Sequence, residues 1–456
     1  MGYLSNTRDH GHPDWKHHFH IFKKCRDVFL GEDRIKDQNE EYLPALPDQT
    51  SASYEIYKSR ATFLNAFNRT ITGLVGSVMR RPATYQVPDR MQDYLEDVNM
   101  MGYDLQTFLA HVLRETFITG RCLILIDRKG DGRPYLTLYG GESFIDWRLD
   151  ENNQPYYIEL KEEVDTSSDP SQDHQMQDQY RNLMLEDGRY MVRVTAHQDE
   201  EEENLRIVDE TEPTMRGEAI DFIPVSLINP GGPGFSVYHP PLLDLANLCI
   251  SHYRTSADLE AGRHYVSIPT PYLIGVDPED YDTGIAIGPT SAIVIPNEAA
   301  KVGFLEFAGV GLKSLEEALT QKEHQMSVLG ARVLERVRTG VESAEAARIH
   351  QASELSILAT IVNEVEKSVL ASLKMIAMWE GLDPSSVSLT MNRDFVDARL
   401  PAKDLQALVD SYLKGALSLD TLVYNMKHGE ILSDDTSIQE EVEKIASKGV
   451  ASSSDE

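Results

Sequence analysis

The stretch RVLERVRTGVESAEAARIH, from Arg332 to His350, separates two long segments with helical periodicity. Thr339 and Glu342 have the spacing of a capping box, in which the threonine hydroxyl accepts a hydrogen bond from a free helix N–H and the glutamate reaches back to the threonine N–H. Gly340 eases the turn between them. The sequence therefore predicts that one helix ends near Val337 and that a new helix begins at Glu342.

Both neighbouring helices are predicted to be long. The first runs from Lys313 to about Val337, and the second from Glu342 to about Glu380. At 1.5 Å per residue the second helix would be roughly 58 Å long, beyond the usual length in globular proteins. A helix of that length commonly serves as a strut in an assembly.

The N-terminal half predicts a mixed α/β arrangement. Helical spacing covers Tyr54 to Arg80 and Tyr103 to Gly120, the latter with Asp104 as N-cap and Gly120 as its stop. The period then changes to two, which predicts strands that continue as one antiparallel meander. The meander is expected over residues 121–139 and 143–163. Further strands are expected at 190–197 and 219–231, on either side of DEEEE at 199–203 as a solvated hairpin.

The C-terminal half is mainly helical. After the breaker NPGGPG at 229–234, a helix is expected from Pro241 to about His264, followed by a few short strands up to Phe307. The tail predicts a strand at 388–395, a helix after Pro401 and a second short helix after Ser418. The last residues, 446–456, are polar and are predicted to be disordered.

Composition excludes several classes of protein. The chain has 456 residues, 41% of them hydrophobic, and a net charge of -31, which argues against a surface that coats nucleic acid. Cys25, Cys122 and Cys249 have no metal-site spacing and are expected to be buried reduced thiols of an intracellular protein. No apolar run is long enough to cross a membrane, no signal peptide is evident, and Asn6 breaks a myristoylation motif.

Catalytic and metal signatures are weak. His17, His18 and His20 favour a surface or partner-facing amphipathic segment over a metal site. The carboxylates Asp127, Asp131 and Asp146 favour turns and strand ends over a catalytic pair. GVGLKS at 309–314 lacks both glycines of a phosphate loop and is interpreted as a helix start, and no hydrolase, zinc-protease or dinucleotide motif occurs. An enzyme is not expected.

The chain resembles the portal proteins of tailed bacteriophages, in particular one portal family formerly classed as a domain of unknown function. The stretches that carry the resemblance, in order, are ITGLVGSVMRRP, GRCLILIDR, YGGESFIDWR, SHYRTSADLEAGRHYVSIPTPYLIG, GPTSAIVIPNEAAKVGFLEF and RTGVESAEAARIH. No single stretch is a chemical signature, so the case rests on their order and joint occurrence from Tyr54 to Ile445. The first fifty residues correspond only loosely.

The resemblance implies a mixed α/β fold with portal-like parts. These are an N-terminal segment (1–53), an α/β wing (54–240), a stem helix (241–264), a clip (265–307), a returning stem helix (308–337), a tunnel loop (338–341), a long wing helix (342–382), a wing strand region (383–400), a helical crown (401–445) and a disordered tail (446–456). The helix break then has a reason, because it lets a short loop project into a central channel.

The resemblance also implies function and site residues. The subunit would form a ring, by resemblance a dodecamer, at one capsid vertex of the virion after assembly in the host cytoplasm. Double-stranded DNA would pass through it, and the terminase large subunit, a head–tail adaptor, and major capsid and scaffolding proteins would bind it, with no cofactor, metal or membrane. The implied tunnel-loop residues are Arg336, Arg338, Thr339, Gly340, Val341 and Glu342, and the implied clip docking residues are Pro269, Pro271, Tyr272, Ile293, Ile295 and Pro296.

Two questions stay open at this point. Arg332, Arg336 and Arg338 either contact the DNA backbone or pair with the nearby Glu335, Glu342 and Glu345, and both can hold. The alternatives to a portal are a hydrolase or transferase with a site near residues 127–146, and a cytosolic helical scaffold.

Overall fold

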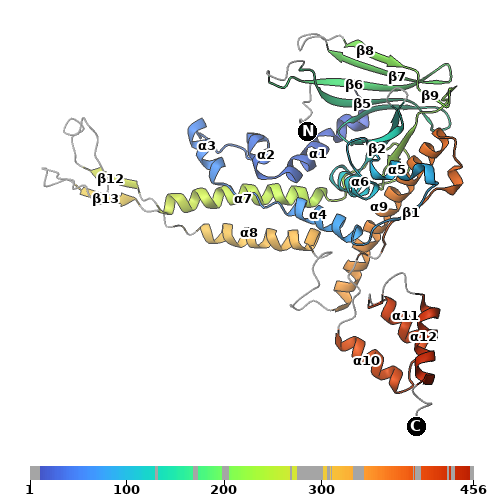
Figure 1. The fold of residues 1–456 in the computed structure, drawn as a ribbon. Coiled ribbons are helices and arrows are strands. Elements are labelled where there is room, and N and C mark those ends of the chain that lie inside the picture. Colours follow the sequence, from blue (N-terminus) through green and yellow to red (C-terminus); the bar gives the residue numbers. More distant parts are fainter. Residues whose placement is uncertain are drawn as a thin grey trace. The chain divides into compact units, whose positions relative to one another are not determined.

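The structure is a computed structural model that describes residues 11–128, 132–167, 173–197, 205–267, 270–274, 301–305, 309, 311–331, 344–393, 395, 402–428, 431–432 and 437–451. The chain forms two compact units, Met1–Arg393 and Asp394–Glu456. Helices and strands are mixed along the first unit, and the second unit contains helices, so the predicted mixed α/β class is confirmed (Figure 1).

The first unit contains both long and short helices. The α-helices are α1 (Pro13–Leu30), α2 (Glu32–Asp37), α3 (Ser51–Arg60), α4 (Ala66–Val78), α5 (Gln92–Glu96), α6 (Leu105–Thr119), α7 (Leu243–Ser267), α8 (Leu312–Met326) and α9 (Ala344–Trp379). Short 3-10 turns occupy Asn39–Glu41, Asp89–Met91 and Pro384–Ser386, and a π-helical turn, Ser327–Ala331, extends α8.

The strands of the first unit form separate antiparallel sheets. One has the order β11 (Val225–Ile228), β2 (Cys122–Arg128), β3 (Pro134–Gly140), and the largest has β4 (Phe144–Leu149), β5 (Pro155–Asp165), β6 (Met176–Glu186), β7 (Arg189–His197), β8 (Leu205–Thr211). Two-stranded sheets pair β1 (Thr84–Gln86) with β14 (Ser388–Thr390), β9 (Thr214–Met215) with β10 (Glu218–Ala219), and β12 (Thr270–Ile274) with β13 (Lys301–Leu305).

The single predicted meander is wrong, because the strands divide between two sheets. β3 ends at Gly140, and the chain turns through Gly141 before β4 begins. A side chain at Gly141 would lie 3.0 Å from Thr119 Cβ, so the turn packs directly on the end of α6. Strands β6 and β8 were not predicted, and the expected hairpin at 199–203 lies outside the described residues.

The predicted helix from Tyr54 to Arg80 is also wrong, since the chain forms α3 and α4 with an extended link between them. Asn65 caps α4 by accepting a hydrogen bond from the Asn68 N–H at 2.9 Å. In the link, the Thr62 N–H donates to Ser256 Oγ on α7 at 3.1 Å. The apolar spacing continues across this break, and spacing alone therefore does not reveal it.

Helix α6 behaves as predicted. The Asp104 carboxylate accepts a hydrogen bond from the Thr107 N–H, and Gly120 ends the helix in the left-handed conformation with φ of 76°. Its apolar residues are buried, together with the strands β2 and β3 that follow it. Helix α9 packs on β2 and β11, which closes the core of the first unit.

Helix α1 is amphipathic as the sequence predicted, with His17 and His20 on its exposed side. Trp15, Phe22 and Cys25 are buried in the first unit. Arg26 is partly exposed and pairs with two buried carboxylates, Glu115 on α6 and Glu142 in the turn before β4. The three cysteines are free and buried, as predicted.

The second unit contains α10 (Ala402–Leu413), α11 (Leu419–His428) and α12 (Ile438–Ala451). Ser418 caps α11 by accepting a hydrogen bond from the Thr421 N–H at 3.2 Å. Helix α12 continues through Ala451, so part of the segment predicted to be disordered is helical, and 452–456 lie outside the described residues. Among the described helices of both units, none is long and apolar enough to cross a membrane.

Candidate functional site

The most distinctive arrangement in the first unit is the pair of helices α7 and α8. They lie side by side, and α7 is placed between α8 and the layer formed by α1 and α3 (Figure 1). Near one end of the pair, Arg263 contacts Glu316, whereas farther along Lys322 contacts Ser251. Because residue numbers fall along α7 as they rise along α8, the two helices are antiparallel.

Polar contacts hold α7 to its neighbours on both sides. Toward α8, Lys322 Nζ donates to the Ser251 carbonyl at 2.9 Å and to Thr255 Oγ1 at 2.5 Å. Toward the N-terminal helices, Tyr57 donates to Asp258 at 2.6 Å, and Arg254 Nε donates to the Tyr42 carbonyl at 2.7 Å. Helix α7 is therefore fixed to the body of the unit, and α8 is fixed to α7.

His252 lies at the contact between the two helices. Its Nε2 is 3.5 Å from Oε1 of Glu323, and both ring nitrogens are buried without a hydrogen bond among the described residues. Burial lowers the pKa of His252, and Glu323 offsets only part of that effect. The imidazole is thus disfavoured as a cation in spite of its acidic neighbour.

A β-hairpin stands where the two helices are joined in the chain. β12 follows α7 and pairs with β13, with Thr270 opposite Leu305 and Ile274 opposite Lys301. Two of the implied docking residues, Pro271 and Tyr272, lie on β12, and the Tyr272 side chain is 44% exposed. The other four, Pro269, Ile293, Ile295 and Pro296, lie outside the described residues.

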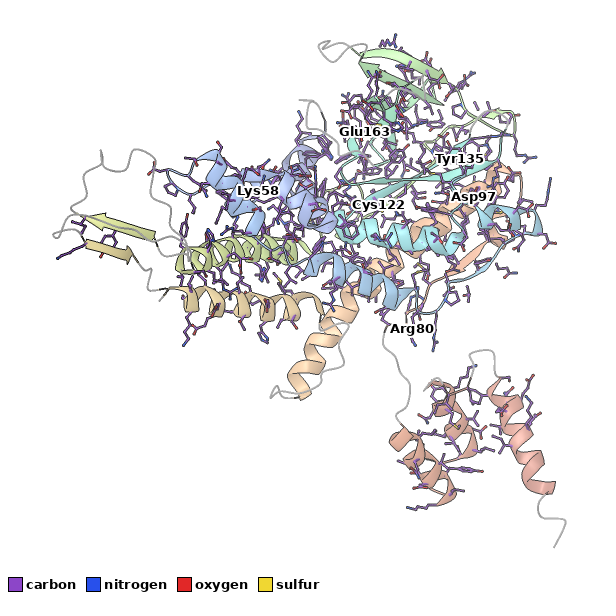
Figure 2. The ribbon with its side chains drawn as sticks, turned by 60° about the vertical axis from the view of Figure 1, so that its left-hand side comes forward. Lys58, Arg80, Asp97, Cys122, Tyr135 and Glu163 are labelled. Atoms are coloured by element: carbon purple, nitrogen blue, oxygen red, sulfur yellow. The ribbon has the colours of Figure 1, made fainter. Side chains whose placement is uncertain are left out.

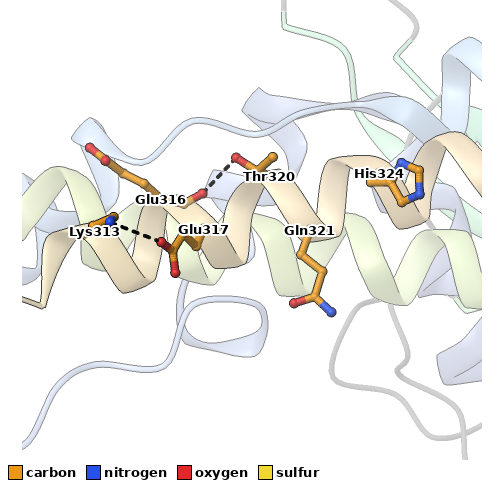
Figure 3. Close-up of a pocket in the computed structure, with 6 residues that line it drawn as sticks. All are labelled: Lys313, Glu316, Glu317, Thr320, Gln321 and His324. Atoms are coloured by element: carbon orange, nitrogen blue, oxygen red, sulfur yellow. Dashed lines mark hydrogen bonds and ion pairs between the residues drawn. The ribbon is translucent and has the colours of Figure 1, made fainter. Parts of the chain in front are cut away.

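The outward side of α8 carries a row of polar side chains that the sequence did not single out. Six of them border an open hollow of about 420 Å³: Lys313, Glu316, Glu317, Thr320, Gln321 and His324 (Figure 3). Their spacing of three or four residues places them on one side of the helix. Lys313 Nζ lies 3.8 Å from Glu317, and the Thr320 hydroxyl donates to the Glu316 carbonyl, so part of the row is satisfied within α8.

The implied tunnel loop lies outside the described residues, as do all six of its named residues and the arginine and glutamate partners weighed with it. The structure does describe what flanks it. α8 and its π-helical turn reach Ala331, and α9 begins at Ala344. A side chain at Gly330 would lie 2.4 Å from Thr70 Oγ1 and 2.8 Å from Leu245, so the π-helical turn packs tightly on α4 and α7.

The carboxylates near the alternative enzyme site are engaged in an ionic network. Arg181 on β6 donates to Asp127 at 3.2 Å and to Glu162 at 2.8 Å. The Tyr135 hydroxyl, labelled in Figure 2 on β3, also donates to Asp127. Burial and Asp127 raise the pKa of Tyr135 to about 12. The network joins the three-stranded sheet to the five-stranded sheet, and this arrangement gives Asp127 a structural role.

Asp146 makes a local contact instead. Asp146 lies inside β4 at a register shift, and its Oδ1 accepts a hydrogen bond from the Trp147 N–H at 2.9 Å. Asp131 lies outside the described residues.

The histidines of α1 make aromatic and backbone contacts. His18 Nδ1 lies 2.8 Å from the Asp14 carbonyl, and its ring lies 5.1 Å from that of His17 and 5.3 Å from that of His239. Burial lowers the pKa of His20, and Lys24 contributes in the same direction. Among the described residues, no three His, Cys, Asp or Glu side chains come together as metal ligands.

One family model matches part of the chain. A family model described as a domain of unknown function (DUF4055) matches residues 241–380, which span α7 to α9. No curated protein matches the chain at a significant level.

Among solved structures, a chain from the neck of an empty gene transfer agent (GTA) particle computed with C6 symmetry is similar at a TM-score of 0.41 and 12% identity, covering 77% of this chain and 87% of that one. A chain from the neck of the native particle computed with C12 symmetry has a TM-score of 0.40 and 12% identity, with 79% and 88% covered. A chain from the virion of the native particle has the same TM-score and identity, with 84% and 96% covered.

Proposed function

We propose that this chain is a portal subunit, which forms a ring at one capsid vertex through which double-stranded DNA is packaged and ejected. It is a structural component of the virion head–tail junction and has no catalytic activity of its own. This function follows the resemblance of the sequence to portal proteins.

The observation that carries the proposal is the layout of α7, the β12–β13 hairpin, α8 and α9. A helix fixed to an α/β body leads to a small hairpin, and an antiparallel helix returns along it. The chain then passes through residues 332–343 into a long helix that packs on the sheets of the body. These parts correspond in order to the stem, clip, tunnel loop and wing that the resemblance implies.

The charges suit a conduit. With a net charge of -31, most of the surface of a ring would repel phosphates, so that DNA slides without the counterion release that drives tight binding. The arginines at 332, 336 and 338 would contact the DNA backbone at one narrow position without reading bases. The exposed acidic groups Glu316 and Glu317 on α8 are consistent with a surface that DNA does not adhere to.

The proposed partners follow from the parts. The clip, which includes Pro271 and Tyr272 on β12, would bind the terminase large subunit during packaging and a head–tail adaptor afterwards. The wing and crown would contact the major capsid and scaffolding proteins. Other copies of the chain would complete the ring, for which we propose twelve subunits.

Negative-stain electron microscopy of the purified full chain tests the proposal. Class averages that show rings with a central hole of DNA-duplex width support a conduit. Uniform small particles at every protein concentration contradict it and favour the scaffold, and turnover in a screen for phosphoester hydrolysis would favour an enzyme instead.

A further inference from the structure

Arg121 is a buried cation outside every element used above. It occupies the step between Gly120, which ends α6, and Cys122, which begins β2 and is labelled in Figure 2. The side chain is 1% exposed, and its guanidinium carbon lies 4.5 Å from the ring centre of Phe144 and 4.7 Å from that of Trp147. Burial lowers the pKa of Arg121 to about 9, against smaller opposing effects of Cys122 and Asp14. Burial of a charged group is unfavourable unless the group is paired and hydrogen-bonded.

Only one side of the guanidinium is satisfied. Nη1 donates to the Phe235 carbonyl at 3.4 Å, whereas Nε and Nη2 are buried without a hydrogen-bond partner in the part of the chain that the structure describes. Nε–H and the neighbouring Nη2–H lie on one edge of the planar group. That edge is the fork with which arginine binds two oxygens of a carboxylate or a phosphate.

A second buried polar atom belongs to Asn229, the residue that follows β11. The last ladder pair of β2 and β11 joins Cys122 to Ile228, so the next antiparallel step sets Asn229 across from Arg121. Asn229 Nδ2 donates to the carbonyls of Gly234 and Ser236 at 2.8 and 2.9 Å, which fixes the orientation of the amide. Asn229 Oδ1 is buried and has no partner among the described residues.

The segment 230–240 covers this position. The Phe235 ring lies 6.0 Å from Phe144 and 6.4 Å from Trp147, centre to centre. At the other end of the segment, a side chain at Gly120 would lie 2.9 Å from Pro240 Cα. These contacts enclose the guanidinium on two sides, so they leave room only for a small ligand.

We propose that the Nε–Nη2 edge of Arg121 binds a small oxyanion, a carboxylate or a phosphate, beneath residues 230–240. The anion's oxygens accept both N–H groups, and a water molecule beside it donates to Asn229 Oδ1. The site is independent of the proposed function, since neither its residues nor its chemistry requires a ring.

Thermal unfolding of the full-length protein tests the site. Phosphate and, separately, acetate are titrated against chloride at matched ionic strength, and the more effective anion identifies the ligand. A ligand that binds only the folded state raises Tm in a saturable way. Arg121→Met removes the fork while keeping an unbranched side chain, and Arg121→Lys keeps the charge without the fork.

We expect a saturable rise in Tm for the wild type and no anion-specific rise for Arg121→Met. For Arg121→Lys, the anion concentration that gives half of the rise in Tm should be about tenfold or more higher than for the wild type. Arg189→Met, which alters an exposed arginine 3.4 Å from Glu212, is the matched control and should respond as the wild type does. An equal response of the wild type and Arg121→Met, or no response of the wild type beyond that to chloride, overturns the proposal.

A second measurement keeps the test valid if the Arg121 variants do not fold. The wild-type protein is crystallised with arsenate, a phosphate analogue whose arsenic scatters anomalously. An anomalous peak in hydrogen-bonding contact with Nε and Nη2 of Arg121 supports the site. Water alone at that edge contradicts it.

Discussion

Replacing Arg26 by methionine should strongly destabilise the first unit. Arg26 Nη1 and Nη2 lie 3.0 and 2.5 Å from the Glu115 carboxylate, and Nε and Nη2 lie 2.8 and 3.2 Å from that of Glu142. Both carboxylates are buried, at 7% and 9% exposure. The substitution removes the cation and leaves two carboxylates facing each other, and removal of one partner from a buried ion pair costs about 3–5 kcal/mol.

The expected loss of unfolding free energy is measured by urea denaturation followed by tryptophan fluorescence. All three tryptophans, Trp15, Trp147 and Trp379, belong to the first unit and so report on it. Lys36→Met is the control, because Lys36 forms an i,i+4 pair with the partly exposed Glu32, and pairs of this kind contribute about 1 kcal/mol or less.

The loss of unfolding free energy in Arg26→Met should also depend on pH. Burial raises the pKa of Glu115, but Arg26 more than offsets this and lowers it below 4.5 in the wild type. A carboxyl with a lowered folded-state pKa stabilises the protein above its unfolded-state pKa, and this stability is lost as pH falls through the folded-state pKa. The variant lacks this contribution, so the difference between the two proteins shrinks on acidification. A deficit no larger than that of Lys36→Met, or one that grows as pH falls, would refute the reasoning.

Three further predictions concern other parts of the chain. Gly120→Ala should cost about 1–3 kcal/mol in thermal or urea unfolding, because φ is 76° there and the new methyl group would meet Pro240; an unchanged midpoint would contradict it. The free energy of unfolding of His252→Gln should fall less than that of the wild type as pH drops below 6.5. The reason is that the lowered pKa of His252 makes the folded state bind a proton less readily than the unfolded state. Equal slopes of unfolding free energy against pH would exclude this role. Deletion of residues 338–341 should leave rings visible by electron microscopy and impair DNA packaging in an infection assay, and normal packaging would remove the loop from the proposed mechanism.

Local signals predicted the elements whose ends are chemically marked. Asp104 and Gly120 define α6 because a carboxylate cap and a left-handed glycine are satisfied within a few residues. GVGLKS at 309–314 was interpreted as a helix start because a helical period follows it, and α8 begins there, at Leu312. Residues 265–307 were expected to form only short strands. Within that segment the structure describes β12 and β13, while α7 continues through Ser267.

Packing decided what these signals left open. The break between α3 and α4 depends on Thr62 meeting Ser256, nearly two hundred residues away, and no local pattern encodes that contact. The sequence predicted α1 as an amphipathic segment, but it did not indicate that Arg26 pairs with Glu115 and Glu142 from other elements. A charged residue at a core position is indistinguishable from a surface one until its partners are known.

Four features could be predicted from the residue pattern alone: the mixed α/β class, the caps of α6, the helix after Pro241 and the burial of the three cysteines. Each of them depends on neighbours along the chain or on composition. Only the folded molecule shows that the strands divide into separate sheets, that Asp127 pairs with Arg181, and that Arg121 is buried. Those features arise from contacts between residues far apart in the chain, whose free energy is gained only when distant elements exclude water together.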